Sequence, residues 1–70
     1  MAEIRAEMVA NIFELQVAEG ERVEAGGTLL LLESMKMEIP VLTEGAGTVT
    51  RVAVAEGDVV QEGDLLAVVE

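Results

Sequence analysis

The chain has 70 residues, 51% of them hydrophobic and only 1% aromatic, which predicts one small domain over residues 1–70 with a thin core of Val, Leu, Ile, Met and Ala. Its formal net charge of -10 disfavours nucleic acid and membrane surfaces as partners, because both are themselves negatively charged. Cys and His are absent, so thiol and imidazole chemistry and the usual zinc ligands are excluded, and we expect neither catalytic residues nor a metal site.

The N-terminal segment carries Glu3, Arg5 and Glu7 where a secretory signal would need an apolar stretch. The apolar run of residues 28–32, which includes Thr28, is far too short to cross a bilayer. We therefore expect a cytoplasmic protein.

The segment from Arg5 to Leu15 alternates polar and apolar residues and contains β-branched ones, which argues against a helix. Phe13, Leu15 and Val17 alternate with polar neighbours, which predicts a strand with these three side chains on one face.

The chain contains an internal repeat. Shifting it by 37 residues aligns VAEGERVEAGGTLLLLE, residues 17–33, with VAEGDVVQEGDLLAVVE, residues 54–70. Each copy has a Glu-Gly step, a second glycine and then a Leu/Val run, a pattern typical of short strands separated by turns. Two copies are too few for a solenoid. The repeat predicts an all-β fold, a small sandwich or flattened barrel with pseudo-two-fold symmetry.

The segment ESMKMEIP, residues 33–40, lies between two short apolar runs, and its spacing predicts a tight hairpin with Lys36 at or beside the tip. Lys36 is the only lysine, and Met35 and Met37 flank it. Pro40 fits an edge strand. The spacing leaves two interpretations open: the methionines fill gaps in the core beside a solvated turn lysine, or they mark an exposed functional amine.

Other eye-catching residues are interpreted as structural. GAG at residues 45–47 is predicted to be a turn, because no helix pattern follows it. Asp58 and Asp64 are predicted to be turn residues, since two separated turns do not converge enough oxygen ligands for a metal. The acidic residues, including Glu19 and the pair Glu33 and Glu38, are expected to form a solvated surface.

ESMKMEIPV resembles the attachment hairpin of biotin carboxyl carrier domains, with Ser34 where that family usually has Ala. GAGTVTRVAVAEGDVVQEGDLLAVVE is similar to the second half of such domains, so the resemblance covers nearly the whole chain. The chain thus resembles the biotinyl/lipoyl attachment family, and within it the small stand-alone biotin attachment proteins. The resemblance implies two four-stranded antiparallel sheets with the modified lysine on an exposed turn.

The resemblance also implies a function. Lys36 would be biotinylated by a biotin protein ligase, with Met35 and Met37 as flanking recognition residues. The biotin arm would carry CO₂, as carboxybiotin, between biotin carboxylase and carboxyltransferase sites on separate chains. The protein itself would be a carrier and not an enzyme. Two alternatives remain: a lipoyl carrier modified on the same lysine, less expected because lipoyl domains usually have Asp-Lys-Ala there, and an unmodified acidic interaction domain.

Overall fold

The computed structural model describes all 70 residues and consists of strands and turns alone. The strands are β1 (Ala2–Arg5), β2 (Ala10–Leu15), β3 (Arg22–Val23), β4 (Thr28–Ser34), β5 (Met37–Leu42), β6 (Gly47–Val52), β7 (Val59–Val60) and β8 (Leu65–Val69). With no helix in the fold, no helical segment could cross a membrane.

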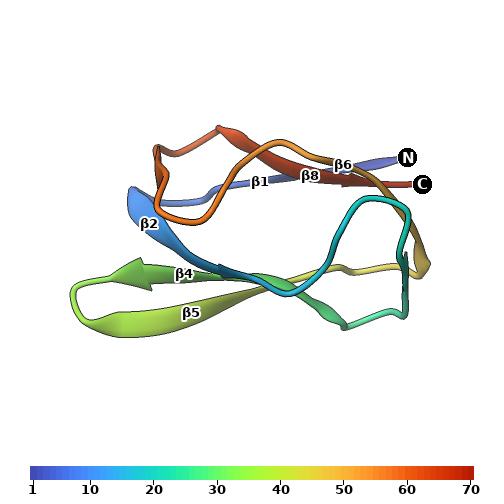
Figure 1. The fold of residues 1–70 in the computed structure, drawn as a ribbon, viewed down its shortest axis with the longest axis horizontal. Helices are drawn as coiled ribbons and strands as arrows, with labels where there is room; N and C mark the ends of the chain where they lie inside the picture. The colour runs from blue at the N-terminus through green and yellow to red at the C-terminus, as the bar shows by residue number, and fades with distance from the viewer.

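The strands form two four-stranded antiparallel sheets, in the orders β1-β8-β6-β3 and β5-β4-β2-β7 (Figure 1). The first sheet contains the strands next to both chain ends and is called the terminal sheet. The second contains the β4–β5 hairpin and is called the hairpin sheet. The predicted all-β fold with two such sheets is confirmed.

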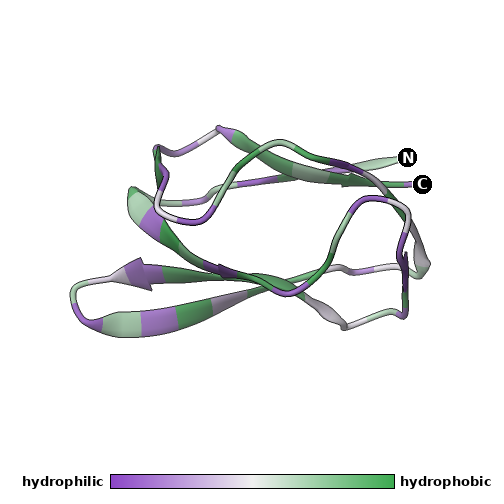
Figure 2. Ribbon diagram, in the orientation of Figure 1, coloured by the Kyte–Doolittle hydropathy of each residue, from purple (hydrophilic) through white to green (hydrophobic).

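The core lies between the sheets: burial alternates at the starts of β2 and β6, whereas β4 and β8 contain consecutive buried residues. Hydrophobic and hydrophilic residues alternate along β5 in particular (Figure 2). The buried core cluster consists of Ala6, Ala10, Ile12, Val23, Leu29, Leu30, Leu32, Val49, Val60, Leu66 and Val69. It contains no methionine, so the prediction that Met would contribute to the core is wrong.

The 37-residue repeat appears in the structure as pseudo-two-fold symmetry. Strands β2, β3, β4 and β5 correspond to β6, β7, β8 and β1. The hydrogen bonds correspond too: the Gly20 N–H donates to the Val49 carbonyl at 2.7 Å, and the Gly57 N–H to the Ile12 carbonyl at 2.8 Å. Both glycines have positive φ, +95° and +93°, a conformation that favours Gly. The predicted symmetry and glycine turns are confirmed.

One consequence of the symmetry is the position of the chain ends. Because β1 corresponds to β5 and β8 to β4, the two termini occupy the place that the β4–β5 turn has in the other half. The termini therefore lie together at the end of the molecule opposite the turn (Figure 1).

Bulges interrupt both copies at equivalent points, and one of them moves Phe13. The β2–β4 register shifts between Ile12 and Glu14, so the simple alternation ends there. Leu15 and Val17 pack against the core, but Phe13 is 45% exposed. The prediction that all three share one face is wrong, because the extra residue of the bulge reverses the alternation.

The bulged segments are held by carboxylates. The Leu15 N–H donates to Glu56 at 3.0 Å, and its symmetry equivalent, the Val52 N–H, donates to Glu19 at 2.9 Å. Each carboxylate thus satisfies a backbone N–H of the other copy. Glu19 is exposed, as expected, and in addition it accepts this backbone hydrogen bond. The signal was present in the sequence, because both copies carry Val-Ala-Glu-Gly.

The predicted turn residues behave as expected. The Asp58 and Asp64 carboxylates accept the backbone N–H groups of Ala55 and Gln61 at 2.9 and 2.8 Å, each closing its own turn. GAG begins in a bend, but Gly47 already starts β6.

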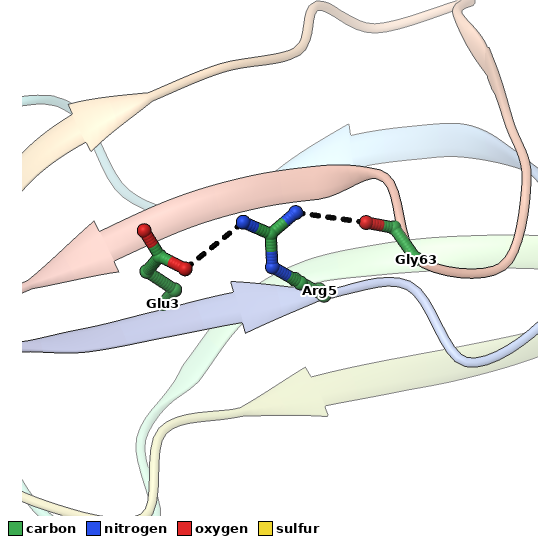
Figure 3. A network of polar contacts seen from close by, with 3 residues as sticks. All are labelled: Glu3, Arg5 and Gly63. Atoms are coloured by element: carbon green, nitrogen blue, oxygen red, sulfur yellow. Dashed lines mark hydrogen bonds and ion pairs between the residues drawn. The ribbon is translucent and has the colours of Figure 1, made fainter.

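The edge strand β1 is fastened by Arg5. Its guanidinium pairs with the Glu3 carboxylate and donates to the Gly63 carbonyl, both at 2.9 Å (Figure 3). The symmetry-equivalent position on β5 is Leu42, whose side chain can form neither contact. Pro40 lies on β5, the edge strand of the hairpin sheet, as predicted.

Candidate functional site

The β4–β5 hairpin ends in a two-residue loop. Ser34 pairs with Met37, which leaves Met35 and Lys36 as the central residues of the turn. Both have positive φ, 53° and 66°, the conformation of a type I′ turn, whose twist matches that of the strands it joins. The predicted hairpin, with Lys36 at its tip, is confirmed.

This turn is unusual because neither central residue is Gly, Asn or Asp. A non-glycine residue held in the left-handed region costs on the order of 1–3 kcal/mol. The paired legs of the hairpin, which continue in register from Ser34–Met37 down to Leu31–Pro40, hold the turn in place. The backbone strain therefore lies at Met35 and Lys36, and the paired strands hold Lys36 at the tip of the hairpin.

The side chain of Lys36 is exposed and its amine has no partner. The only ion pair in the structure joins Arg5 and Glu3, on the terminal sheet. No side-chain hydrogen bond involves the Lys36 amine either. The amine is therefore free to enter the site of another protein without first breaking a contact.

Met35 and Met37 surround the lysine with exposed apolar surface. Met35 is 91% exposed and Met37 is 60% exposed. The interpretation that these methionines fill gaps in the core is wrong. A flexible, polarisable thioether adapts its shape to a partner surface, so these two side chains suit recognition by another protein.

Two carboxylates stand directly behind the tip. Glu33 and Glu38 are a cross-strand pair, and like charges placed opposite each other are destabilising. The structure pairs neither of them with a cation. The sequence suggested only solvated acids here, because their alignment across the hairpin depends on the register.

The surface has two hollows of similar volume, and both lie away from the turn. A groove of about 360 Å³ runs between the edge strands β1 and β5, and its apolar lining includes Ile4, Met8 and Ile39. None of the turn residues lines it. No three His, Cys, Asp or Glu side chains are grouped as metal ligands would be. What the site offers chemically is one uncovered amine on a strained, well-held turn.

A small β-sandwich with a single unpartnered lysine at the tip of a rigid hairpin has the geometry of a carrier domain, in which a covalently attached group is presented to other proteins. The comparison with known families agrees, since the family described as "Biotin-requiring enzyme" matches residues 2–69. The chain belongs to this biotin/lipoyl attachment family.

Relatives match this chain over most of their own length. The chain is 57% identical to a biotinylated protein TB7.3 homolog of Mycobacterium leprae, over 99% of both chains. It is 41% identical to a biotin/lipoyl attachment protein of Bacillus subtilis, over 90% of this chain and 86% of that one. Among solved structures, the urea carboxylase of Kluyveromyces lactis superimposes with a TM-score of 0.92 at 32% identity, covering 99% of this chain and 6% of that one.

Proposed function

We propose that this protein is a biotin carrier in which Lys36 is the attachment residue. The observation that carries the proposal is the geometry of the turn: Lys36 is its only ionisable side chain, is exposed, and has no hydrogen-bond or ion-pair partner. Relatives named as biotinylated or biotin/lipoyl attachment proteins support biotin as the attached group. The flanking Met35 and Met37 would be contacted by the modifying enzyme.

The attachment reaction requires an activated acyl donor, because a free carboxylate does not acylate an amine. A biotin protein ligase would supply biotinyl-adenylate, made from biotin and ATP with release of pyrophosphate. The Lys36 amine, after losing a proton, would attack the carbonyl carbon of this donor. An amide C–N bond forms as the C–O bond to AMP breaks and AMP leaves. The net charge then falls from its formal value of -10 by one unit.

The residues present fit such a group, because nothing covers the amine and the rigid hairpin fixes the point from which a long arm would swing. Biotin at this point would supply a reversible attachment site for CO₂. The domain would contribute position and effective concentration, and the chemistry would belong to biotin carboxylase and carboxyltransferase sites on other chains. We place the protein in the cytoplasm, as one carrier domain over residues 1–70 without catalysis of its own.

The decisive experiment is intact mass spectrometry of the protein after reaction with a purified biotin protein ligase, biotin, ATP and Mg²⁺, followed by peptide mapping. We expect one biotin, on Lys36. Lys36→Arg should abolish the mass shift and keep the thermal unfolding profile of the wild type, because the side chain is exposed and unpaired.

Because Lys36 is the only lysine, residual labelling of the variant could come only from the Met1 amine, which peptide mapping separates. A wild-type protein that stays unmodified would contradict the proposal. If protein isolated from its host carried a lipoyl group on Lys36, the protein would be a lipoyl carrier and not a biotin carrier.

A further inference from the structure

The two sheets present different surfaces to solvent. The large apolar side chains that are exposed, apart from Met1, all lie on the hairpin sheet or in the connection leading into it: Met8, Val9, Phe13, Met35, Met37, Leu42 and Val59. The outer face of the terminal sheet carries none of them. Met8 and Leu42 line the groove between β1 and β5, and the exposed apolar side chains that remain on the hairpin sheet favour an interaction surface there.

Three of these side chains form a patch on the outer face of the hairpin sheet. Asn11 of β2 pairs with Val59 of β7, so Val9 and Phe13, two residues to either side of Asn11, are diagonal neighbours of Val59. Val9 is 63%, Phe13 45% and Val59 66% exposed. Asn11 also pairs with Glu33, one residue before Ser34, so the patch begins beside the base of the Lys36 turn.

The charged residues also differ between the two sheets. Arg5, Arg22 and Arg51 all lie in strands of the terminal sheet. The hairpin sheet has no arginine, and its outer face carries Glu14, Glu33 and Glu38, which no cation neutralises in the structure. A partner for this face should therefore combine an apolar centre with basic groups around it.

The pseudo-symmetry shows that the architecture does not require this apolar surface. Phe13 corresponds to Thr50 and Val59 to Arg22, in equivalent strands of the terminal sheet. The same backbone thus forms with polar residues at these positions. Folding alone therefore does not explain why Phe13 and Val59 are apolar, whereas contact with a partner protein would explain it.

We propose that the outer face of the hairpin sheet, through Val9, Phe13 and Val59, is a docking surface for the enzyme that acylates Lys36. The inference rests on the proposed function. It extends recognition beyond the turn, because Asn11, which pairs with Val59, also pairs with Glu33 at the base of the Lys36 turn. The matching enzyme surface has an apolar centre with Lys or Arg around it.

A second copy of this chain is a poorer occupant. Packing two hairpin sheets face to face would bring together two acidic surfaces, each with Glu14, Glu33 and Glu38 and with the turn residue Lys36 as its only cation. Like charges brought together in this way oppose association. A basic enzyme surface has no such penalty.

The test compares initial rates of biotin transfer by a purified biotin protein ligase to the wild type and to the double variant Phe13→Thr/Val59→Thr. We expect kcat/KM to fall roughly tenfold, mainly through a higher KM, because exposed apolar anchors at interfaces contribute disproportionately to binding. The matched control is Thr50→Phe/Arg22→Val, which places the same apolar pair on the terminal sheet and should react within about twofold of the wild type. Wild-type KM should also rise with added salt.

Thermal unfolding of each variant verifies that it is folded, and the single variant Val59→Thr gives a second measurement if the double variant is destabilised. A normal rate for the double variant would overturn the docking surface while Lys36 is still modified, leaving the proposed function intact. A wild type that is not acylated would overturn both. A wild-type dimer in size-exclusion chromatography with light scattering that the double variant abolishes would assign the face to a second copy instead.

Discussion

The two halves of this molecule share a backbone but not a surface. Equivalent hydrogen bonds hold both: Ala6 N–H donates to the Asp64 carbonyl, and Thr43 N–H to the Gly27 carbonyl, each at 2.9 Å. The two halves differ in the side chains that they expose to solvent. One half continues through the Lys36 turn, where the other half has the chain ends.

This difference separates two kinds of requirement on the sequence. Positions that repeat, such as the turn glycines and the Glu19 and Glu56 acceptors, maintain the fold. Positions that do not repeat, such as Met35 and Lys36, serve the function proposed for the hairpin turn. Substitutions at equivalent positions can therefore test which requirement applies at each place.

The largest effect is expected in the core, where the two halves should respond alike. Leu29 and Leu66 are symmetry equivalents, both fully buried. Replacing either by Ala should lower the free energy of unfolding by about 2–5 kcal/mol, which comes close to unfolding so small a domain. Urea denaturation of both variants measures this. A variant that loses little stability while its equivalent unfolds would show that the core is not symmetric.

A smaller and unequal effect is expected at the start of β2 and β6. Gly47 corresponds to Ala10, but a Cβ on Gly47 would lie 2.5 Å from the Glu70 carbonyl oxygen, so the backbone would have to move. Gly47→Ala should therefore cost about 1–3 kcal/mol. Ala10→Gly should cost roughly 0.5–1 kcal/mol. Urea denaturation ranks the two, and the reverse order would contradict the close contact at the C-terminus.

A similarly small effect on stability, but of opposite sign, is expected at the turn. Met35→Asn places a residue that tolerates positive φ at a position with φ of 53°, and should raise the free energy of unfolding by about 1 kcal/mol. The same change removes an exposed thioether beside Lys36, so biotin transfer should slow. Thermal unfolding and ligase kinetics measure the two effects. Lower stability would refute the backbone strain at Met35. Faster labelling would refute its role in recognition by the ligase.

Most of the fold followed from the repeat, because glycine turns and alternating apolar residues specify strands locally. The hairpin and the place of Lys36 followed for the same reason, while the number of strands came from the family resemblance. The exposure of Phe13 could not be predicted, because a bulge is defined by the partner strand and not by the residues that form it. The alignment of Glu33 with Glu38 likewise depends on the register, which the sequence does not state.

The exposed methionines show a different limit. An apolar residue in a short chain is ordinarily assigned to the core, and Met is included in the expected core for that reason, while the spacing leaves the role of Met35 and Met37 open. None of the four is buried, because the core is filled by shorter branched side chains on the inner faces of the sheets.

The location of the chain ends has a practical consequence. The molecule measures 31 × 17 × 17 Å, and the ends lie together at the side opposite the Lys36 turn (Figure 1). If this lysine is biotinylated, a cargo protein fused to either end would be held on the far side of the domain from a streptavidin-coated support. The domain would then serve as a compact immobilisation tag that orients its cargo and keeps it clear of the surface.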